Sequence, residues 1–280
     1  MTILELVLLF LSLSLSALGG YYVCLVSEWY YFWISFFFPL PLYIILFYGW
    51  VSLLLVWGFF FNTKKEIHHF SRFYYSFLYQ TDKTFVKVNR VHARVRHENL
   101  IPSKQRFVLI SNHVSNWDQM VVIAALKRKF QPLACVTKPE NLSFPIAGPF
   151  IHHSGFIPIN RDNPLEGKKA IEQGVRYLKD NECNVYICPE GTRNKTEAPT
   201  LPFHPGSFRL AMWAKAPIVL LCLKGTKEIK GNAPLKKSYV DIDVVKVITP
   251  EEYEGLTPSF LASMCQEIIV DNLLEDSLLL

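Results

Sequence analysis

The N-terminal part of this chain is almost free of charge, and this feature constrains its structure most. Residues 6–27 and residues 29–63 carry no charged side chain, and only Glu28 separates the two runs. A helix that spans a bilayer needs about 20 apolar residues. The first run supplies them, and the second supplies them over residues 42–61, after two prolines interrupt the pattern. We therefore expect residues 1–61 to form a membrane-embedded segment of two helices that either cross the bilayer or enter one leaflet.

Basic residues follow this segment at once. Lys64, Lys65 and Arg72 flank the second run, and basic flanks favour the cytoplasmic side of a membrane. We therefore expect a membrane protein whose residues 62–280 form a domain on the cytoplasmic side. The formal charge of +5 agrees with a surface that faces anionic lipid headgroups. No Lys or Arg precedes the first apolar run, so a cleaved signal peptide is not expected.

Residues 62–280 are long enough for one domain with a full hydrophobic core. Apolar runs of strand length alternate there with helical patterns, which predicts a layered α/β fold. The predicted strands are 107–110, 132–137, 156–159, 185–188, 218–223 and 239–248. The predicted helices are 117–127, 164–179 with Asn163 as N-cap, 208–214, and a last helix that opens at Thr257 and Pro258.

The six cysteines and eight histidines do not form a metal-binding pattern. The cysteines are scattered without a CxxC pair, which is typical of reduced core residues in a cytoplasmic domain. The pairs His68–His69 and His152–His153 lack the spacing of a helical metal site. No metal is expected.

A histidine and an aspartate stand five positions apart directly after the first predicted strand, in the segment Asn112–Asp118. On one regular helix their side chains would point about 140° apart and could not meet. If Ser115 or Asn116 caps the next helix, His113 lies in the preceding turn and Asp118 in the first helical turn. The carboxylate can then orient one ring nitrogen, and the other nitrogen can accept a proton from a hydroxyl.

The segment Pro189–Arg193 follows another predicted strand. Gly191 permits a close approach of the backbone, and Arg193 offers a fork of donors that suits phosphate. Glu190 can either orient the arginine or hold the turn. Ligand sites in α/β folds gather at the carboxyl ends of strands, so this segment and His113 are expected at one edge of the sheet.

Two further cations follow strands. Lys138 comes directly after the strand 132–137, and Arg161 ends the segment Gly155–Arg161. Together with Arg193 they place three cationic side chains at three strand exits, which favours a phosphate-bearing substrate.

These segments resemble the 1-acylglycerol-3-phosphate O-acyltransferases, within the wider glycerolipid acyltransferase superfamily. The family's Asn-His-x4-Asp block corresponds to Asn112–Asp118, and its Gly-Phe-Ile block that ends in arginine corresponds to Gly155–Arg161. Its Pro-Glu-Gly-Thr-Arg block is intact at Pro189–Arg193, and its apolar fourth block corresponds to Ala216–Leu220. The match covers about residues 60–250. The family's membrane-docking helical pair resembles residues 1–61.

Five positions, in or beside three of the blocks, depart from the family pattern. Cys188 stands where Phe is common, and Leu220 stands where the fourth block often has proline. Val114, Asn116 and Trp117 are an uncommon filling of the first block. These departures concern acyl-chain and acceptor preference and leave the reaction class unchanged.

The resemblance implies a twisted mixed sheet flanked by helices. It also implies transfer of a fatty acyl group from acyl-CoA or acyl-carrier protein to the sn-2 hydroxyl of lysophosphatidic acid, which gives phosphatidic acid. His113 would be the general base and Asp118 its orienting partner, with oxyanion donors at the start of the following helix. No cofactor, protein nucleophile or nucleic-acid partner is implied, whereas membrane lipids are. The substrate-binding residues implied are Asn112, Ser115, Lys138, Arg161, Glu190, Gly191, Thr192 and Arg193.

Three alternatives remain at this stage. The same catalytic pair serves an acyltransferase for another lysolipid acceptor. It also serves an acyl thioesterase, in which water replaces the lipid hydroxyl. A scaffold without activity is the third, and the intact His113, Asp118, Glu190 and Arg193 argue against it. The donor, the chain length and the oligomeric state do not follow from the sequence.

Overall fold

The computed structural model describes Val7, residues 10–18, Tyr21, and residues 39–59, 67–127, 130–144, 147–160 and 163–275. The chain divides into two compact units, Met1–Asn62 and Thr63–Leu280, which are treated separately here.

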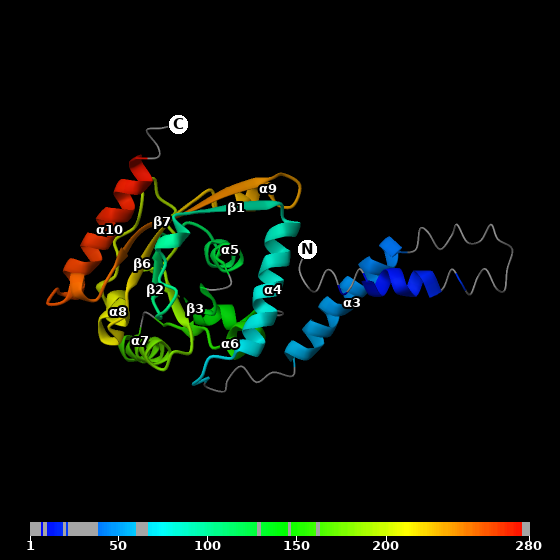
Figure 1. The fold of residues 1–280 in the computed structure, drawn as a ribbon, viewed down its shortest axis with the longest axis horizontal. Coiled ribbons are helices and arrows are strands. Elements are labelled where there is room, and N and C mark those ends of the chain that lie inside the picture. Colours follow the sequence, from blue (N-terminus) through cyan, green and yellow to red (C-terminus); the bar gives the residue numbers. More distant parts are fainter. Residues whose placement is uncertain are drawn as a thin grey trace. The chain divides into compact units, whose positions relative to one another are not determined.

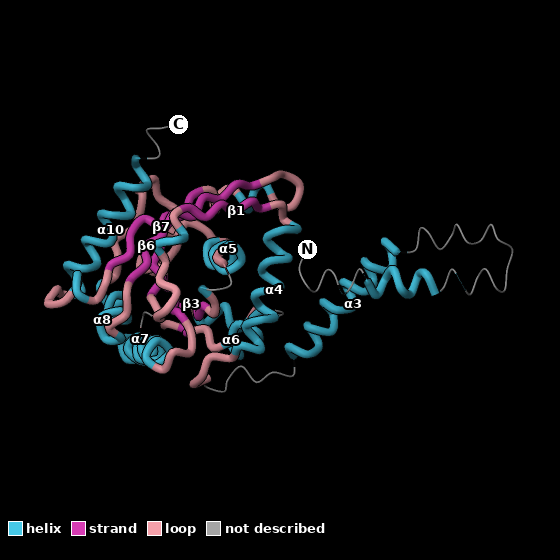
Figure 2. The backbone as a smooth tube through the Cα atoms, in the orientation of Figure 1, coloured by secondary structure: helices cyan, strands magenta, loops and turns pink. Residues whose placement is uncertain are grey.

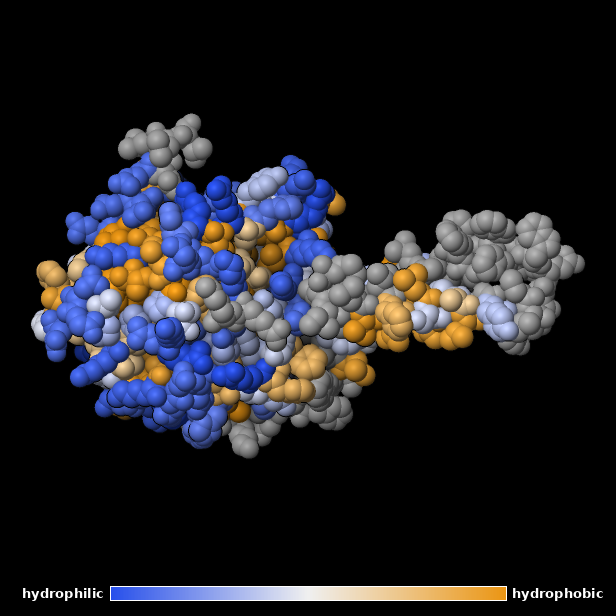
Figure 3. Space-filling model, in the orientation of Figure 1, coloured by the Kyte–Doolittle hydropathy of each residue, from blue (hydrophilic) through white to orange (hydrophobic). Residues whose placement is uncertain are grey.

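In the first unit, helix α3 spans Pro39–Phe59. It begins at Pro39 and not at Leu42 as predicted, because a proline in the first turn of a helix loses no hydrogen bond. Its surface is largely hydrophobic (Figure 3), with Ile45 and Leu53 more than half exposed. Among the described residues, no helix combines the length and the hydropathy that a membrane crossing requires. The membrane-embedded pair of helices therefore stays a prediction.

The second unit is built on one sheet of seven strands (Figure 1) in the order β1-β7-β6-β2-β5-β3-β4. All neighbouring strands are parallel except β6 and β7, which makes the sheet mixed, as expected. Each of the six predicted strands is present within one or two residues, and β1 was not predicted. The strands are β1 Val91–Arg96, β2 Val108–Ser111, β3 Leu133–Thr137, β4 Ile157–Pro158, β5 Asn184–Ile187, β6 Ile218–Lys224 and β7 Ser238–Ile248.

Helices cover both faces of this sheet (Figure 2), and a separate hydrophobic core lies under each layer. One core contains residues of α7, α8 and α10, and the other contains residues of α4 and α5. The helices are α4 Arg72–Val88, α5 Asp118–Ala125, α6 Ala147–Ser154, α7 Pro164–Lys179, α8 Arg209–Ala214, α9 Ile229–Asn232 and α10 Pro258–Glu275, with short 3-10 helices η4 Pro139–Ser143 and η5 Pro205–Phe208.

The central strands are continuous apolar runs in the sequence because both of their faces are buried. Along β2, Val108 and Ile110 belong to one core and Leu109 to the other, and all three are fully buried. Strands covered on both faces need apolar side chains at every position. The strands β2, β3 and β5 are parallel, so their carboxyl ends, and the segments that follow them, meet at one edge of the sheet.

Candidate active site

His113 and Asp118 are in direct contact at this edge. The Nδ1 atom of His113 lies 2.7 Å from the Oδ2 atom of Asp118. As predicted, His113 lies in the turn after β2 and Asp118 is the first residue of α5. The Asp118 carboxylate can only accept, so it fixes the proton on Nδ1 and leaves Nε2 as an acceptor. The carboxylate is fully buried, whereas 21% of the histidine side chain is exposed.

The Asp118 carboxylate also organises the turn that carries His113. Its Oδ2 atom accepts hydrogen bonds from the backbone N–H groups of Val114 at 2.8 Å and Ser115 at 2.9 Å. A carboxylate at the start of a helix is further favoured by the helix dipole. The hydrogen bonds to Asp118 therefore fix the backbone of this turn, and they also fix the orientation of the His113 ring.

The prediction that Ser115 or Asn116 caps this helix was wrong. The N-cap position is Trp117, and it has no side-chain cap. The Ser115 hydroxyl instead accepts from the backbone N–H of Trp117 at 3.3 Å. The backbone donors of Val114, Ser115 and Trp117 are thus engaged and do not face an oxyanion. Asn116, between them, lines the pocket described below.

Thr226 completes the environment of Asp118 and was missed by the sequence analysis. Its hydroxyl donates to the Oδ1 atom of Asp118 at 2.5 Å, and it is fully buried. Thr226 follows the end of β6, which pairs with β2 in parallel. The fourth family block, Ala216–Leu220, forms the start of the same strand, at the end away from His113. No local pattern marks Thr226, because it reaches Asp118 across 108 positions of sequence.

Glu190 connects the segment Pro189–Arg193 with the segment Asn112–Asp118. Its Oε1 atom accepts from the backbone N–H of His113 at 2.6 Å, and its Oε2 atom accepts from Leu201 at 2.8 Å. Of the two roles predicted for Glu190, holding the chain in place is the one observed. Burial raises the pKa of this carboxyl, and the two backbone hydrogen bonds oppose that rise. Glu190 therefore links the His113 turn to the Pro189–Arg193 segment.

A pocket of about 220 Å³ opens at His113. Five predicted site residues line it, namely His113, Lys138, Gly191, Thr192 and Arg193. Lys138 and Arg193 are exposed, so their charges face solvent and any molecule in the pocket. Lining residues that were not predicted to contact substrate are Asn116, Gln119, Val136, Thr137, Asn141, Ile187 and Cys188. The pocket thus combines a base with two cations from two different strand exits.

The remaining predicted residues are placed differently. Asn112 is 1% exposed, and its side-chain amide both donates to and accepts from the backbone of Leu223. Asn112, Ser115 and Glu190 are buried around the pocket and are not among its lining residues. Arg161 lies outside the described residues. For the first three, the placement fits support of the His113 turn better than contact with substrate.

Cys188 is the thiol that lines the pocket, and burial raises its pKa to about 12. It is therefore protonated near neutral pH and is a poor nucleophile. Its sulfur lies 3.7 Å from the Ser111 hydroxyl, which also contacts Tyr186. Within the described ranges, no three His, Cys, Asp or Glu side chains are grouped to hold a metal ion.

Comparisons with known proteins agree with this chemistry. A family model described as acyltransferase matches residues 92–224. A 1-acyl-sn-glycerol-3-phosphate acyltransferase from Saccharomyces cerevisiae is 30% identical over 190 residues, which are 65% of this chain and 59% of the relative. The alpha form from Mus musculus is 27% identical over 178 residues, which are 64% of this chain and 61% of the relative. The chain thus spans about three fifths of the length of these relatives.

A solved structure has the same fold. It is the crystal structure of the 1-acyl-sn-glycerophosphate (LPA) acyltransferase PlsC from Thermotoga maritima, with a TM-score of 0.60 and 19% sequence identity. The match covers 94% of this chain and 95% of that chain. Residues 92–224, which match the acyltransferase family model, include His113, Asp118 and Pro189–Arg193. Over residues 92–224 the chain is therefore similar to the acyltransferase family, and the relatives named above are 1-acyl-sn-glycerol-3-phosphate acyltransferases.

Proposed function

We propose that this protein transfers a fatty acyl group from a thioester to the sn-2 hydroxyl of 1-acylglycerol-3-phosphate and so forms phosphatidic acid. The observation that carries the proposal is the pocket lined by Lys138, Arg193 and His113, whose ring is held by Asp118. The names of the relatives support the acceptor. The thioester is that of coenzyme A or acyl-carrier protein.

The reaction needs one base. Asp118 holds the proton on Nδ1 of His113, so Nε2 is free to take the proton of the 2-hydroxyl as its oxygen attacks the thioester carbonyl. The carbonyl oxygen gains negative charge in the tetrahedral intermediate, and the C–S bond then breaks. The thiolate leaves and takes the proton back from His113. Burial raises the pKa of the Cys188 thiol to about 12, so this thiol is a poor nucleophile, and the proposed acyl transfer is direct.

The phosphate of the acceptor is recognised by charge. Lys138 and Arg193 enter the pocket from the segments after β3 and β5. A phosphate monoester suits the forked donors of arginine and the point charge of lysine. Contacts from two neighbouring strand exits would fix the glycerol backbone, so that the 2-hydroxyl faces His113.

The test uses the purified full chain in detergent with lysophosphatidic acid and a long-chain acyl-CoA, with acyl-carrier protein as donor in parallel. Phosphatidic acid and free thiol are measured together. His113→Ala should abolish both. Arg193→Ala should raise the KM for lysophosphatidic acid about tenfold or more, as expected for a lost charged hydrogen bond. Lys195→Ala, a nearby exposed cation that does not line the pocket, should leave it unchanged.

Other outcomes would replace the proposal. Thiol release without phosphatidic acid, at a rate that an acceptor does not change, would indicate a thioesterase. Transfer to a lysolipid that lacks a phosphate monoester, with Arg193→Ala harmless, would indicate another lysolipid acceptor. Normal transfer by His113→Ala would contradict the assigned base.

The proposed location is a membrane, with residues 62–280 on the cytoplasmic side. The uncharged runs before residue 62 and the basic residues after it support this proposal. Because lysophosphatidic acid and its product are both lipids, an enzyme held at the bilayer would meet its acceptor there.

A further inference from the structure

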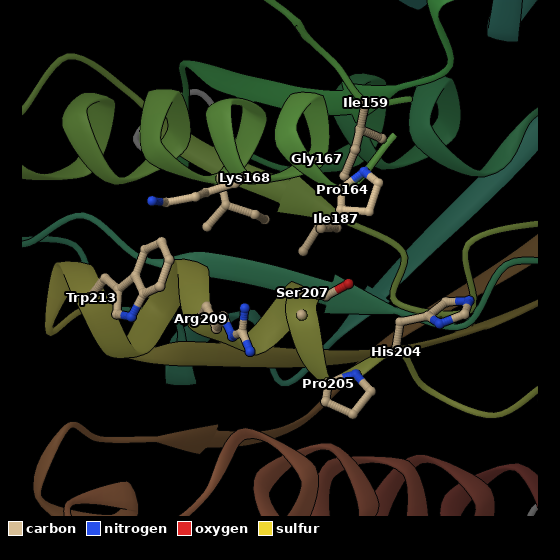
Figure 4. A pocket seen from close by; sticks show the side chains of 12 residues that line it. Ile159, Pro164, Gly167, Lys168, Ile187, His204, Pro205, Ser207, Arg209 and Trp213 are labelled. Carbon is tan, nitrogen blue, oxygen red and sulfur yellow. The ribbon is translucent and has the colours of Figure 1, made fainter. Parts of the chain in front are cut away.

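A second cavity, of about 330 Å³, lies between α7 and the η5–α8 segment (Figure 4). Its volume lies at the lower end of the range for sites that bind small molecules and cofactors. Its lining residues include Lys168 of α7, Ile187 of β5, His204 directly before η5, and Arg209 and Trp213 of α8. The cavity is larger than the catalytic pocket, and neither the base nor the proposed phosphate site uses it.

The side chains of this cavity suit an anionic aromatic molecule. Arg209 and Trp213 are one helical turn apart on α8, and Lys168 faces them from α7 (Figure 4). Trp213 is 41% exposed, which leaves surface for another ring to stack upon. The twelve lining residues, all of them in the described part, include no Asp or Glu. Glu172 approaches Lys168 at 3.7 Å, but both side chains are more than half exposed, so this ion pair is weak.

The two cavities share one lining residue, at the end of β5. Ile187, the last residue of that strand, lines both of them. The backbone N–H of His204, at the start of the η5 segment, donates to the carbonyl oxygen of Pro189 at 2.9 Å. The wall of the second cavity is thus attached to the segment that carries Arg193. A long ligand with one end at Trp213 that passes Ile187 would reach the pocket lined by His113.

We propose that this second cavity binds the phosphorylated nucleotide end of coenzyme A, which makes acyl-CoA the donor. The adenine ring stacks on Trp213, the phosphates pair with Arg209 and Lys168, and the flexible arm passes Ile187 to deliver the thioester to His113. The inference rests on the proposed acyl transfer and selects between its two donor classes. A fatty acyl chain would fit the charged side chains of Lys168 and Arg209 poorly. A carrier protein lacks the nucleotide that would fill the cavity.

The test compares two donors with the full chain in detergent. One is a long-chain acyl-CoA, and the other is the N-acetylcysteamine thioester of the same fatty acid, which keeps the reacting group and lacks the nucleotide. Arg209→Ala and Trp213→Ala should each raise the KM for acyl-CoA about tenfold, as expected for one lost charged hydrogen bond or stacking contact, with kcat unchanged. Neither should change the KM for the short thioester or for lysophosphatidic acid. Lys169→Ala, an exposed neighbour on α7 outside the cavity, is the matched control.

Direct binding of adenosine 3′,5′-bisphosphate, measured by calorimetry, separates this inference from the proposed function. Binding that Arg209→Ala weakens supports the nucleotide site even if no phosphatidic acid forms with any donor. Equal effects of the variants on both donors, or no effect on acyl-CoA, would overturn the site and leave the acyl transfer intact. Transfer from acyl-carrier protein alone, without binding of the bisphosphate, would overturn it as well.

Discussion

At the scale of single residues, Asp118 is the centre of the catalytic arrangement. Its carboxylate accepts from His113, from two backbone N–H groups and from the Thr226 hydroxyl. All four donors need an acceptor that carries no hydrogen. Only an ionised carboxylate meets this requirement, which explains why an acid and not an amide stands at this position.

Asp118→Asn therefore tests the orientation of the base. The amide directs N–H groups at donors, so the His113 ring loses its fixed tautomer. We expect kcat to fall by about 10³- to 10⁴-fold with little change in the KM for lysophosphatidic acid.

Thr226→Val removes one charged hydrogen bond and should lower kcat about tenfold. Thr226→Ser keeps the hydroxyl and is the matched control; equal losses in both Thr226 variants would exclude this role of the hydroxyl.

At the scale of elements, helix α4, which packs against α5 on the same face of the sheet, carries a buried acid. Asp82 is 8% exposed, and burial raises its carboxyl pKa well above the usual value. The folded protein therefore holds this proton more tightly than the unfolded chain does. The resulting stability is fully present below the unfolded pKa and is lost as the pH rises through the folded pKa.

Asp82→Asn should remove this dependence. The variant should have a higher free energy of unfolding than the parent protein at pH 8, and the difference should shrink towards pH 4. Each unit between the two pKa values corresponds to about 1.4 kcal/mol. Denaturant unfolding at several pH values measures it. Asp271→Asn, at an exposed position of α10, should show no such trend. A gain in stability that is the same at pH 4 and pH 8 would contradict the explanation.

At the scale of the whole molecule, the chain joins an apolar N-terminal unit to a catalytic unit with two complete hydrophobic cores. Removal of residues 1–62 should therefore leave a folded catalytic unit. We expect this shortened protein to lose most of its activity towards long-chain lysophosphatidic acid in vesicles, because it no longer associates with the bilayer. Its activity towards a short-chain acceptor in solution should persist. Undiminished activity in vesicles would contradict a membrane role for the first unit.

Much of the catalytic unit was predictable from local sequence. The apolar runs predicted six strands, and Asn163 caps α7 as expected, with its side chain accepting from Leu165 at 3.1 Å. The contact between His113 and Asp118 also followed from five residues of spacing and a helix start. Helix α4 and strand β1 were not assigned. The buried apolar residues of α4 are Tyr75, Leu78 and Val86, and they belong to a core built mostly from segments far along the chain.

The sequence by itself determined the layered α/β class, the strands that end at the site, and the catalytic pair, because each depends on periodicity or on neighbours along the chain. Only the tertiary structure decided how the site is held and how large it is. Glu190 reaches His113 across 77 positions, and Thr226 reaches Asp118 across 108. The second cavity likewise needs α7 and α8 to pack together. Contacts of this range depend on how the helices pack on the sheet, and no short stretch of sequence encodes that packing.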